Sequence, residues 1–350
     1  MAYDVNAKIR ALEPYRPVPG DCRVRLDANE SFLRPSPALL EAIGREAASV
    51  AFNRYPDPCA EELCRAFAGF YGVDPDDVAA GNGSDELISL LFSAFLMKGE
   101  CVTTLSPDFS MYRFYGGLSE ARGLEYRKRP DFTVDVDDLI RFVSESGARM
   151  LIFSNPCNPT SLGLKRGEIR RLVRSIDALV VLDEAYMDFW DQSLLGEERN
   201  FDNLVILRTC SKAAGMAALR LGFAVANPKL IRFLKAAKSP YNVNAVSQRI
   251  GTALFGQPEW LSFCRGEIVA SRDALFSGLK QLEAERPGHL RVFDTVTNFV
   301  TVGLRDSAAA CGRLRENGIA VRCFDGFLRV TVGSERENDE FLGTFSKILI

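Results

Sequence analysis

Histidine is almost absent from this chain of 350 residues, since His289 is the only one. A metal site built from several histidines is therefore excluded, and any histidine-activated nucleophile would depend on this single side chain. The nine cysteines are scattered and form no Cys-x-x-Cys pair, which argues against a zinc site and a disulfide framework. We expect reduced thiols, no metal, and chemistry carried by lysine, aspartate, tyrosine and arginine.

Long hydrophobic runs and a strong charge bias are also missing. No apolar run approaches the roughly 18 residues of a membrane span, and the N-terminus lacks the basic and then apolar pattern of a signal peptide. The net charge of −3 gives no bulk attraction to nucleic acid or anionic membranes. With 47% hydrophobic residues, the composition is that of a globular protein long enough for two domains. We expect a cytoplasmic protein without nucleic-acid or membrane partners.

Short apolar segments alternate with helical patterns through the middle of the chain. The predicted strands are 101–105, 150–154, 179–183, 203–208 and 221–227, and the predicted helices are 84–97 and 166–175. These strands are apolar on both faces, as in a buried parallel sheet. The alternation predicts an α/β fold whose large domain holds a mostly parallel, doubly wound sheet.

The pattern changes near residue 250. A predicted helix at about 258–286 precedes alternating segments at 289–293, 298–304, 320–324 and 327–333, which favour a smaller α+β domain with an antiparallel sheet. The first forty residues are interrupted by prolines and too irregular for a core element, so we expect an arm packed on the small domain or a partner subunit. The predicted division is 1–40 for the arm and part of the small domain, 41–249 for the large domain and 250–350 for the small domain.

One lysine stands in an almost apolar, close-packed segment at 208–222. Lys212 follows Ser211, precedes Arg220 by eight residues and is surrounded by alanine and glycine. A buried ammonium is costly, and desolvation favours the neutral amine, which attacks carbonyl groups. Such a lysine suits a Schiff base with pyridoxal phosphate, and Ser211 and Arg220 suit the phosphate. Taken alone, the segment also fits a lysine whose ammonium reaches solvent beside a helix start.

Other polar residues follow predicted strands at their carboxyl ends, where open α/β sheets bind ligands. Asp183 suits the ring nitrogen of the cofactor and Tyr186 its ring oxygen, although a strand-end aspartate is also a common helix cap. Asn155 lies in an Asn-Pro turn, and Phe109 suits either stacking on a flat ring or the core. Residues 81–86 open a helix whose N-terminus suits a phosphate. Together these residues could supply every contact that pyridoxal phosphate needs, at its phosphate, its ring, its ring nitrogen and its ring oxygen.

Eight motifs are spread over nearly the whole chain: LDANES (26–31), NRYPDP (53–58), GNGSDELI (81–88), NPCNPT (155–160), DEAY (183–186), RTCSKAAGMAALRLGF (208–223), PYNVN (240–244) and LRVTVG (328–333). They resemble those of fold-type I pyridoxal phosphate-dependent aminotransferases, and within them most closely the histidinol-phosphate aminotransferases. The resemblance implies pyridoxal 5'-phosphate as cofactor and amino transfer from histidinol phosphate to 2-oxoglutarate. It also implies a homodimer with shared active sites.

The resemblance also implies residue roles. Lys212 would form the Schiff base, with Asp183 at the ring nitrogen and Tyr186 as the third catalytic residue. Further cofactor contacts are implied for Gly83, Ser84, Asp85, Phe109, Asn155, Ser211, Arg220 and, from the other subunit, Tyr55. The residues that match the family's grip on the substrate phosphate are Tyr15, Arg322 and Arg329.

Two motifs depart from the family pattern. Ser161 replaces the final glycine of NPxNPTG, and residues 26–37 match the usual LNxNPxGPSP only loosely. Neither departure touches a catalytic residue, but both leave the substrate more open than the cofactor.

Three other functions stay open at this point. An aromatic amino-acid aminotransferase is one, because an arginine fork suits a carboxylate as well as a phosphate. A threonine-phosphate decarboxylase is another, and a non-catalytic ligand-binding relative is the third, although the joint presence of Lys212, Asp183 and Tyr186 argues against it. A nicotinamide dehydrogenase fails for want of a GxGxxG motif. We expect Cys157 and Cys210, near the cofactor, to be inert apolar residues.

Overall fold

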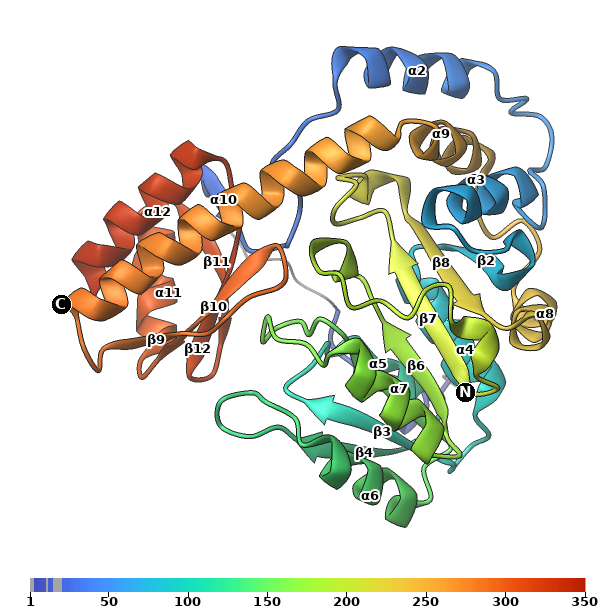
Figure 1. The fold of residues 1–350 in the computed structure, drawn as a ribbon, viewed down its shortest axis with the longest axis horizontal. Coiled ribbons are helices and arrows are strands. Elements are labelled where there is room, and N and C mark those ends of the chain that lie inside the picture. Colours follow the sequence, from blue (N-terminus) through green and yellow to red (C-terminus); the bar gives the residue numbers. More distant parts are fainter. Residues whose placement is uncertain (1–2, 11, 15–20, 350) are drawn as a thin grey trace.

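The computed structural model describes residues 3–10, 12–14 and 21–349. Within these residues the strands form two sheets, which lie side by side in Figure 1. The seven strands of the larger sheet are β2 (Val78–Asn82), β3 (Cys101–Ser106), β4 (Arg122–Arg127), β5 (Met150–Ser154), β6 (Leu179–Asp183), β7 (Leu204–Thr209) and β8 (Leu221–Ala226). Their order across the sheet is β2-β8-β7-β6-β5-β3-β4.

The larger sheet is mostly parallel, as predicted. β3, β4, β5, β6 and β7 pair in parallel, and β8 is antiparallel to both of its neighbours. Two strands escaped the sequence analysis, β2 because its residues are mostly small, and β4 because it is an edge strand with mostly exposed polar residues. The predicted α/β fold is confirmed.

Helices cover both faces of the larger sheet because its strands are apolar on both faces. Val180 and Leu182 of β6 belong to one hydrophobic cluster, whereas the intervening Val181 belongs to another. The first cluster includes residues of α3 (Glu61–Tyr71), α6 (Val136–Ser146) and α7 (Arg166–Ser175), and the second includes residues of α4 (Ser84–Phe95) and α8 (Pro228–Ala237). The other helices of this part of the chain are α2 (Pro37–Ala48), α5 (Met111–Leu118) and α9 (Ala245–Phe255).

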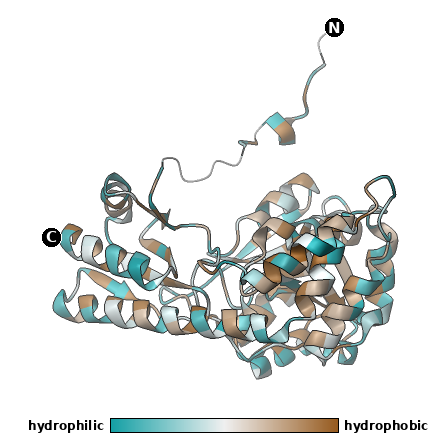
Figure 2. Ribbon diagram, turned by 90° about the horizontal axis from the view of Figure 1, so that it is seen from above, coloured by the Kyte–Doolittle hydropathy of each residue, from teal (hydrophilic) through white to brown (hydrophobic). Residues whose placement is uncertain are grey.

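The smaller sheet has the order β1-β11-β12-β10-β9. Its strands are β1 (Val24–Leu26), β9 (Leu290–Val292), β10 (Phe299–Leu304), β11 (Ile319–Phe324) and β12 (Phe327–Thr331), and the accompanying helices are α10 (Pro258–Glu285), α11 (Ser307–Glu316) and α12 (Glu335–Ile348). β9 to β12 pair antiparallel. Figure 2 shows hydrophobic and hydrophilic bands alternating along the helices, as expected of helices that bury one face.

The N-terminal segment contributes a core strand, which corrects the expectation that the first forty residues are too irregular for one. β1 pairs in parallel with β11, and Val24 and Leu26 are almost completely buried. A short helix, α1 (Ala7–Arg10), contacts α5 through Lys8, whose Nζ donates to the Leu118 carbonyl at 3.0 Å. The division at 40/41 and 249/250 remains our proposal. Among the described residues, no helix has the length and apolarity needed to cross a membrane.

Candidate active site

The predicted site residues follow strands that end at one edge of the larger sheet. Ser154, Asp183 and Leu207 are paired in register across β5, β6 and β7, so the carboxyl ends of these strands lie side by side. β2 runs parallel to β7, because β8 is antiparallel to both, and β2 leads into α4 at the same edge. Open α/β sheets bind ligands at this edge.

Arg220 joins the start of α4 to the segment after β7. Its Nη1 donates to Ser211 Oγ at 3.4 Å, and its Nη2 lies 3.6 Å from Asp85 Oδ2. Gly83 has a positive φ of 81°, a conformation that favours glycine, and a Cβ there would lie 2.6 Å from Arg220 Nη2. The residues predicted to bind the phosphate, with Ser84 as the first residue of α4, are therefore brought together.

Asp183 is a buried carboxyl group held by two donors. The Tyr112 hydroxyl donates to its Oδ2 at 2.8 Å, and the Ala185 N–H donates to its Oδ1 at 3.1 Å. Burial raises the pKa of Asp183 to about 6, although both hydrogen bonds act in the opposite direction. A buried carboxyl group with a raised pKa at a strand end is suited to meet a cationic or proton-bearing ligand atom.

Lys212 lies beside Tyr186 and is half-buried rather than enclosed. Its Nζ donates to the Ala28 carbonyl at 3.4 Å and lies 5.8 Å from the centre of the Tyr186 ring. The Tyr186 hydroxyl accepts from Asn29 Nδ2 at 2.8 Å. Asn29 is in turn bonded to Thr331 of the smaller sheet, so both sheets contribute to the surroundings of Lys212.

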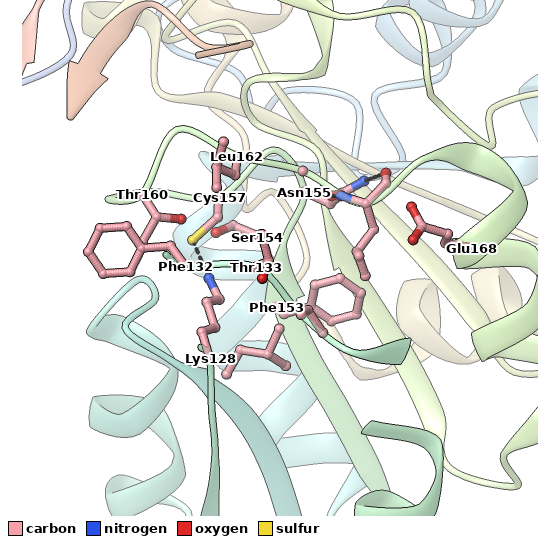
Figure 3. A pocket seen from close by; sticks show the side chains of 14 residues that line it. Lys128, Phe132, Thr133, Phe153, Ser154, Asn155, Cys157, Thr160, Leu162 and Glu168 are labelled. Atoms are coloured by element: carbon pink, nitrogen blue, oxygen red, sulfur yellow. Dashed lines mark hydrogen bonds between the residues drawn. The ribbon is translucent and has the colours of Figure 1, made fainter. Parts of the chain in front are cut away.

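Asn155 and Phe109, which are expected to contact the cofactor ring, differ in burial and in hydrogen bonding. Asn155 is buried, and its amide closes a loop by donating to the Leu164 carbonyl at 3.0 Å and accepting from the Leu164 N–H at 2.7 Å (Figure 3). One amide N–H of Asn155 is therefore used within the loop. Phe109 is half-buried and forms a T-shaped contact with Tyr112, with ring centres 5.6 Å apart.

β11 and β12 bring two arginines together. Arg322 and Arg329 are direct partners in register, although like charges in such positions repel. Arg329 is buried and donates to Asn158 Oδ1 at 2.5 Å and to the Asp27 carbonyl at 2.6 Å. Arg322 is half-buried and has no ion pair within the part of the chain that the structure describes. The pair is suited to an anionic ligand.

Tyr55, expected at the site of the partner subunit, lies at the surface of this chain. Tyr55 is 81% exposed and stacks on Tyr241, with ring centres 4.7 Å apart. Tyr15 lies outside the described residues.

Three positioning residues were missed by the sequence analysis. Tyr112 holds Asp183, Asn29 holds Tyr186, and Glu184 accepts from buried Arg208 Nη1 at 3.1 Å behind the same strand ends. Asn29 and Glu184 stand in motifs that the sequence analysis quoted, and Tyr112 stands three residues after Phe109. Their partners are distant in sequence, so their spacing alone gave no signal.

Comparison with known proteins identifies relatives over nearly the whole length. A family model described as aminotransferase class I and II matches residues 23–345. The histidinol-phosphate aminotransferase of Clostridium kluyveri is 37% identical over 341 residues, which cover 96% of each chain. The histidinol-phosphate aminotransferase of Clostridium novyi is 38% identical over 339 residues, which cover 95% of this chain and 94% of the relative.

Solved structures share the fold. Histidinol-phosphate aminotransferase from Sinorhizobium meliloti, in complex with pyridoxal-5'-phosphate, has a TM-score of 0.87 at 21% identity and covers 99% of this chain and 98% of its own. L-Threonine-O-3-phosphate decarboxylase from Porphyromonas gingivalis has a TM-score of 0.79 at 21% identity, covering 93% of this chain and 99% of its own. The fold is thus common to both reactions. On the match of the family model and the two Clostridium relatives, the chain belongs to the aminotransferase class I and II family.

Proposed function

We propose that this enzyme transfers the amino group of histidinol phosphate to 2-oxoglutarate, giving imidazole-acetol phosphate and glutamate in histidine biosynthesis. The observation that carries the proposal is the pair Arg322 and Arg329, held in register on β11 and β12. Two guanidinium groups suit a dianion such as a phosphate monoester. The two Clostridium relatives are named for this activity.

Pyridoxal phosphate is the cofactor of this family, and the residues at the strand ends fit it. We assign its phosphate to Arg220, Ser211 and the first turn of α4, where backbone N–H groups and the helix dipole favour an anion. A Cβ at Gly222 would lie 2.3 Å from the Ser84 backbone nitrogen, so glycine allows β8 to approach this turn. Buried Asp183 suits the protonated ring nitrogen.

When bound, the cofactor supplies a conjugated ring that accepts electron density from the carbon beside the substrate amine. Lys212 Nζ is the group that holds the cofactor and then carries the proton of that carbon, first as base and later as acid. Tyr112 and the Ala185 N–H orient the Asp183 carboxylate. Asn29 orients the Tyr186 hydroxyl, which we assign to the ring oxygen.

The remaining ring contacts are assigned to Asn155 and Phe109. Leu164 uses one N–H of the Asn155 amide, which leaves the second for the ring oxygen. Phe109 is half-buried and forms a T-shaped contact with Tyr112, and we assign it to stacking on the cofactor ring.

We infer a cytoplasmic homodimer with shared active sites. Tyr55 and Phe52 are 81% and 77% exposed, and exposed aromatic side chains are typical of protein interfaces. Tyr55 would then reach the cofactor phosphate in the partner subunit, and Tyr15 would contact the substrate phosphate. The nine cysteines form no disulfide, which suits a reducing compartment. Sedimentation of the purified protein as a monomer would contradict the dimer.

Two sister reactions remain candidates. Arg329 donates through two nitrogens, so it also suits the carboxylate of an aromatic amino acid. Threonine-phosphate decarboxylase shares the fold and would use the same arginines for its own phosphate.

The experiment that tests the proposal is product analysis with the cofactor-loaded protein. Histidinol phosphate and 2-oxoglutarate should give glutamate and imidazole-acetol phosphate. Parallel reactions contain phenylalanine with 2-oxoglutarate, and threonine phosphate alone. Glutamate formed mainly from phenylalanine would contradict the proposed substrate. Release of CO₂ from threonine phosphate without amino transfer would contradict the proposed reaction.

A further inference from the structure

A second group of reactive side chains, which does not include Lys212, lies at the Asn-Pro turn. Lys128 directly follows β4, and its Nζ lies 2.8 Å from Cys157 Sγ. The same Nζ donates to the Pro107 carbonyl at 2.9 Å and lies 4.0 Å from Asp108 Oδ2. Both charged side chains are buried, with 3% and 2% of their surfaces exposed, and Cys157 is also buried. No step of the proposed reaction uses these groups.

The Lys128–Cys157 contact is unusually close. Its length falls in the range of N–H···O hydrogen bonds, although sulfur is the larger atom. Burial opposes the charge on Lys128, but Cys157 and Asp108 outweigh it and raise the pKa of the amine. Burial raises the pKa of Asp108, which favours its taking up a proton, although Ser154 donates to it through its hydroxyl and its N–H and acts in the opposite direction.

A cavity of about 210 Å³ gives a small molecule access to this pair. Lys128 and Cys157 line it together with Phe132 and Thr160, as Figure 3 shows. The volume exceeds that of a water-sized oxidant such as hydrogen peroxide. Other buried thiols, such as Cys210 and Cys264, have no lysine amine in hydrogen-bond contact among the described residues.

We propose that Lys128 and Cys157 form a modification site, at which peroxide joins Nζ to Sγ in a covalent sulfenamide link. In the first step, peroxide oxidises the thiol to a sulfenic acid and is itself reduced, releasing one water. In the second step, the Lys128 ammonium gives a proton to Asp108, the amine attacks Sγ, and the S–O bond breaks with loss of a second water. Sulfur is thereby oxidised by two electrons, and the expectation that Cys157 is inert is set aside.

The link would tie the end of β4 to the turn that joins both sheets. Asn158 of that turn accepts from Arg329, and the Pro159 carbonyl accepts from Thr301 of β10 at 2.7 Å. The link would also remove the cation that faces Asp108. The site is therefore a place where oxidation constrains the contact between the two sheets.

Peptide mapping of the holoenzyme tests the proposal without an activity assay. The protein is treated with hydrogen peroxide, unfolded without reductant, digested with trypsin and analysed by mass spectrometry. We expect the peptides containing residues 128 and 157 to be joined, with a mass two hydrogen atoms below their sum. Cleavage after Lys128 should be lost, and dithiothreitol should restore both peptides.

Matched variants separate the link from general oxidation. Cys157→Ser should abolish the joined peptide, and Cys64→Ala, which removes another buried thiol, should leave its yield unchanged. The wild-type map decides the question even where a variant fails to fold. An unmodified Cys157, or its sulfinic or sulfonic acid with residue 128 in a free peptide, would overturn the proposal.

Discussion

The cofactor side of the candidate site and its substrate side are built differently. The proposed cofactor residues follow strands of one sheet, and register alone places Asp183 beside the end of β5. The substrate side is assembled across the chain, since Arg329 contacts Asp27 and Asn158, which lie 302 and 171 residues away. The first side is set by a single sheet, and the second depends on how two sheets meet. Changes on the cofactor side should therefore affect every substrate, and changes on the substrate side should alter preference.

Lys212→Ala should have the largest effect. Loss of the only amine assigned to the cofactor and to the proton should reduce amino transfer by about 10⁴-fold or more for all donors. Glutamate formation from 2-oxoglutarate measures the loss, and Lys229→Ala, on the exposed surface of α8, is the control. Wild-type turnover in the Lys212→Ala protein would contradict the assignment of Lys212 as the catalytic amine.

Asp183→Asn should have the second-largest effect, and the loss of activity should be the same for every substrate. Replacing the carboxylate by a neutral amide removes the charge that faces the ring nitrogen, which should lower kcat by about 10²-fold to 10³-fold. The same loss should be measured with histidinol phosphate and with phenylalanine. A loss confined to one donor would place Asp183 on the substrate side instead.

Arg322→Ala should separate the two sides. Removal of one charge-assisted hydrogen bond costs about 1.5–3 kcal/mol, so kcat/KM for histidinol phosphate should fall by about 10-fold to 100-fold. Phenylalanine, which has no phosphate, should be affected far less. Arg291→Ala, an exposed arginine on β9 of the same sheet, is the control. Equal losses for both donors would argue against a phosphate-binding role.

Tyr112→Phe should have the smallest effect, which should be a shift in the pH dependence of cofactor binding. The pKa of Asp183 is about 6, and the Tyr112 hydroxyl lowers it. Asp183 is ionised above that pH, so affinity for the cofactor should fall as the pH drops through about 6. Without the hydroxyl, the Asp183 pKa should rise and the decline should begin about one pH unit higher. Fluorescence titration of each cofactor-free protein with the cofactor, repeated across the pH range, measures this affinity. Protonation of the cofactor itself affects both proteins equally, so the difference between them reports Asp183.

The elements predicted best from the sequence are those that a short stretch of sequence identifies by itself. The strands at 150–154 and 179–183 were predicted with their observed ends, because buried parallel strands are continuous apolar runs bounded by polar residues. β1 was missed because three residues among prolines carry no periodic signal, and its burial depends on pairing with β11. Pairing between strands that are distant in sequence cannot be predicted from the pattern of a short segment.

The same distinction applies to the candidate site. Lys212, Ser211 and Arg220 were found together because they lie within one short segment. The Tyr112–Asp183 bond and the Lys128–Cys157 contact join residues from different elements, and only the folded sheet brings them into contact. Ser161, which replaces the final glycine of NPxNPTG, adopts a positive φ of 63° and donates to the Asp294 carbonyl.

The central claim is that the paired arginines select a phosphorylated amine. The most direct test compares kcat/KM for histidinol phosphate with that for histidinol, which differs only by the phosphate. We predict a preference for histidinol phosphate of about 10²-fold or more, because two guanidinium groups lose their anion in the shorter substrate. Equal kcat/KM values for the two substrates would contradict the account.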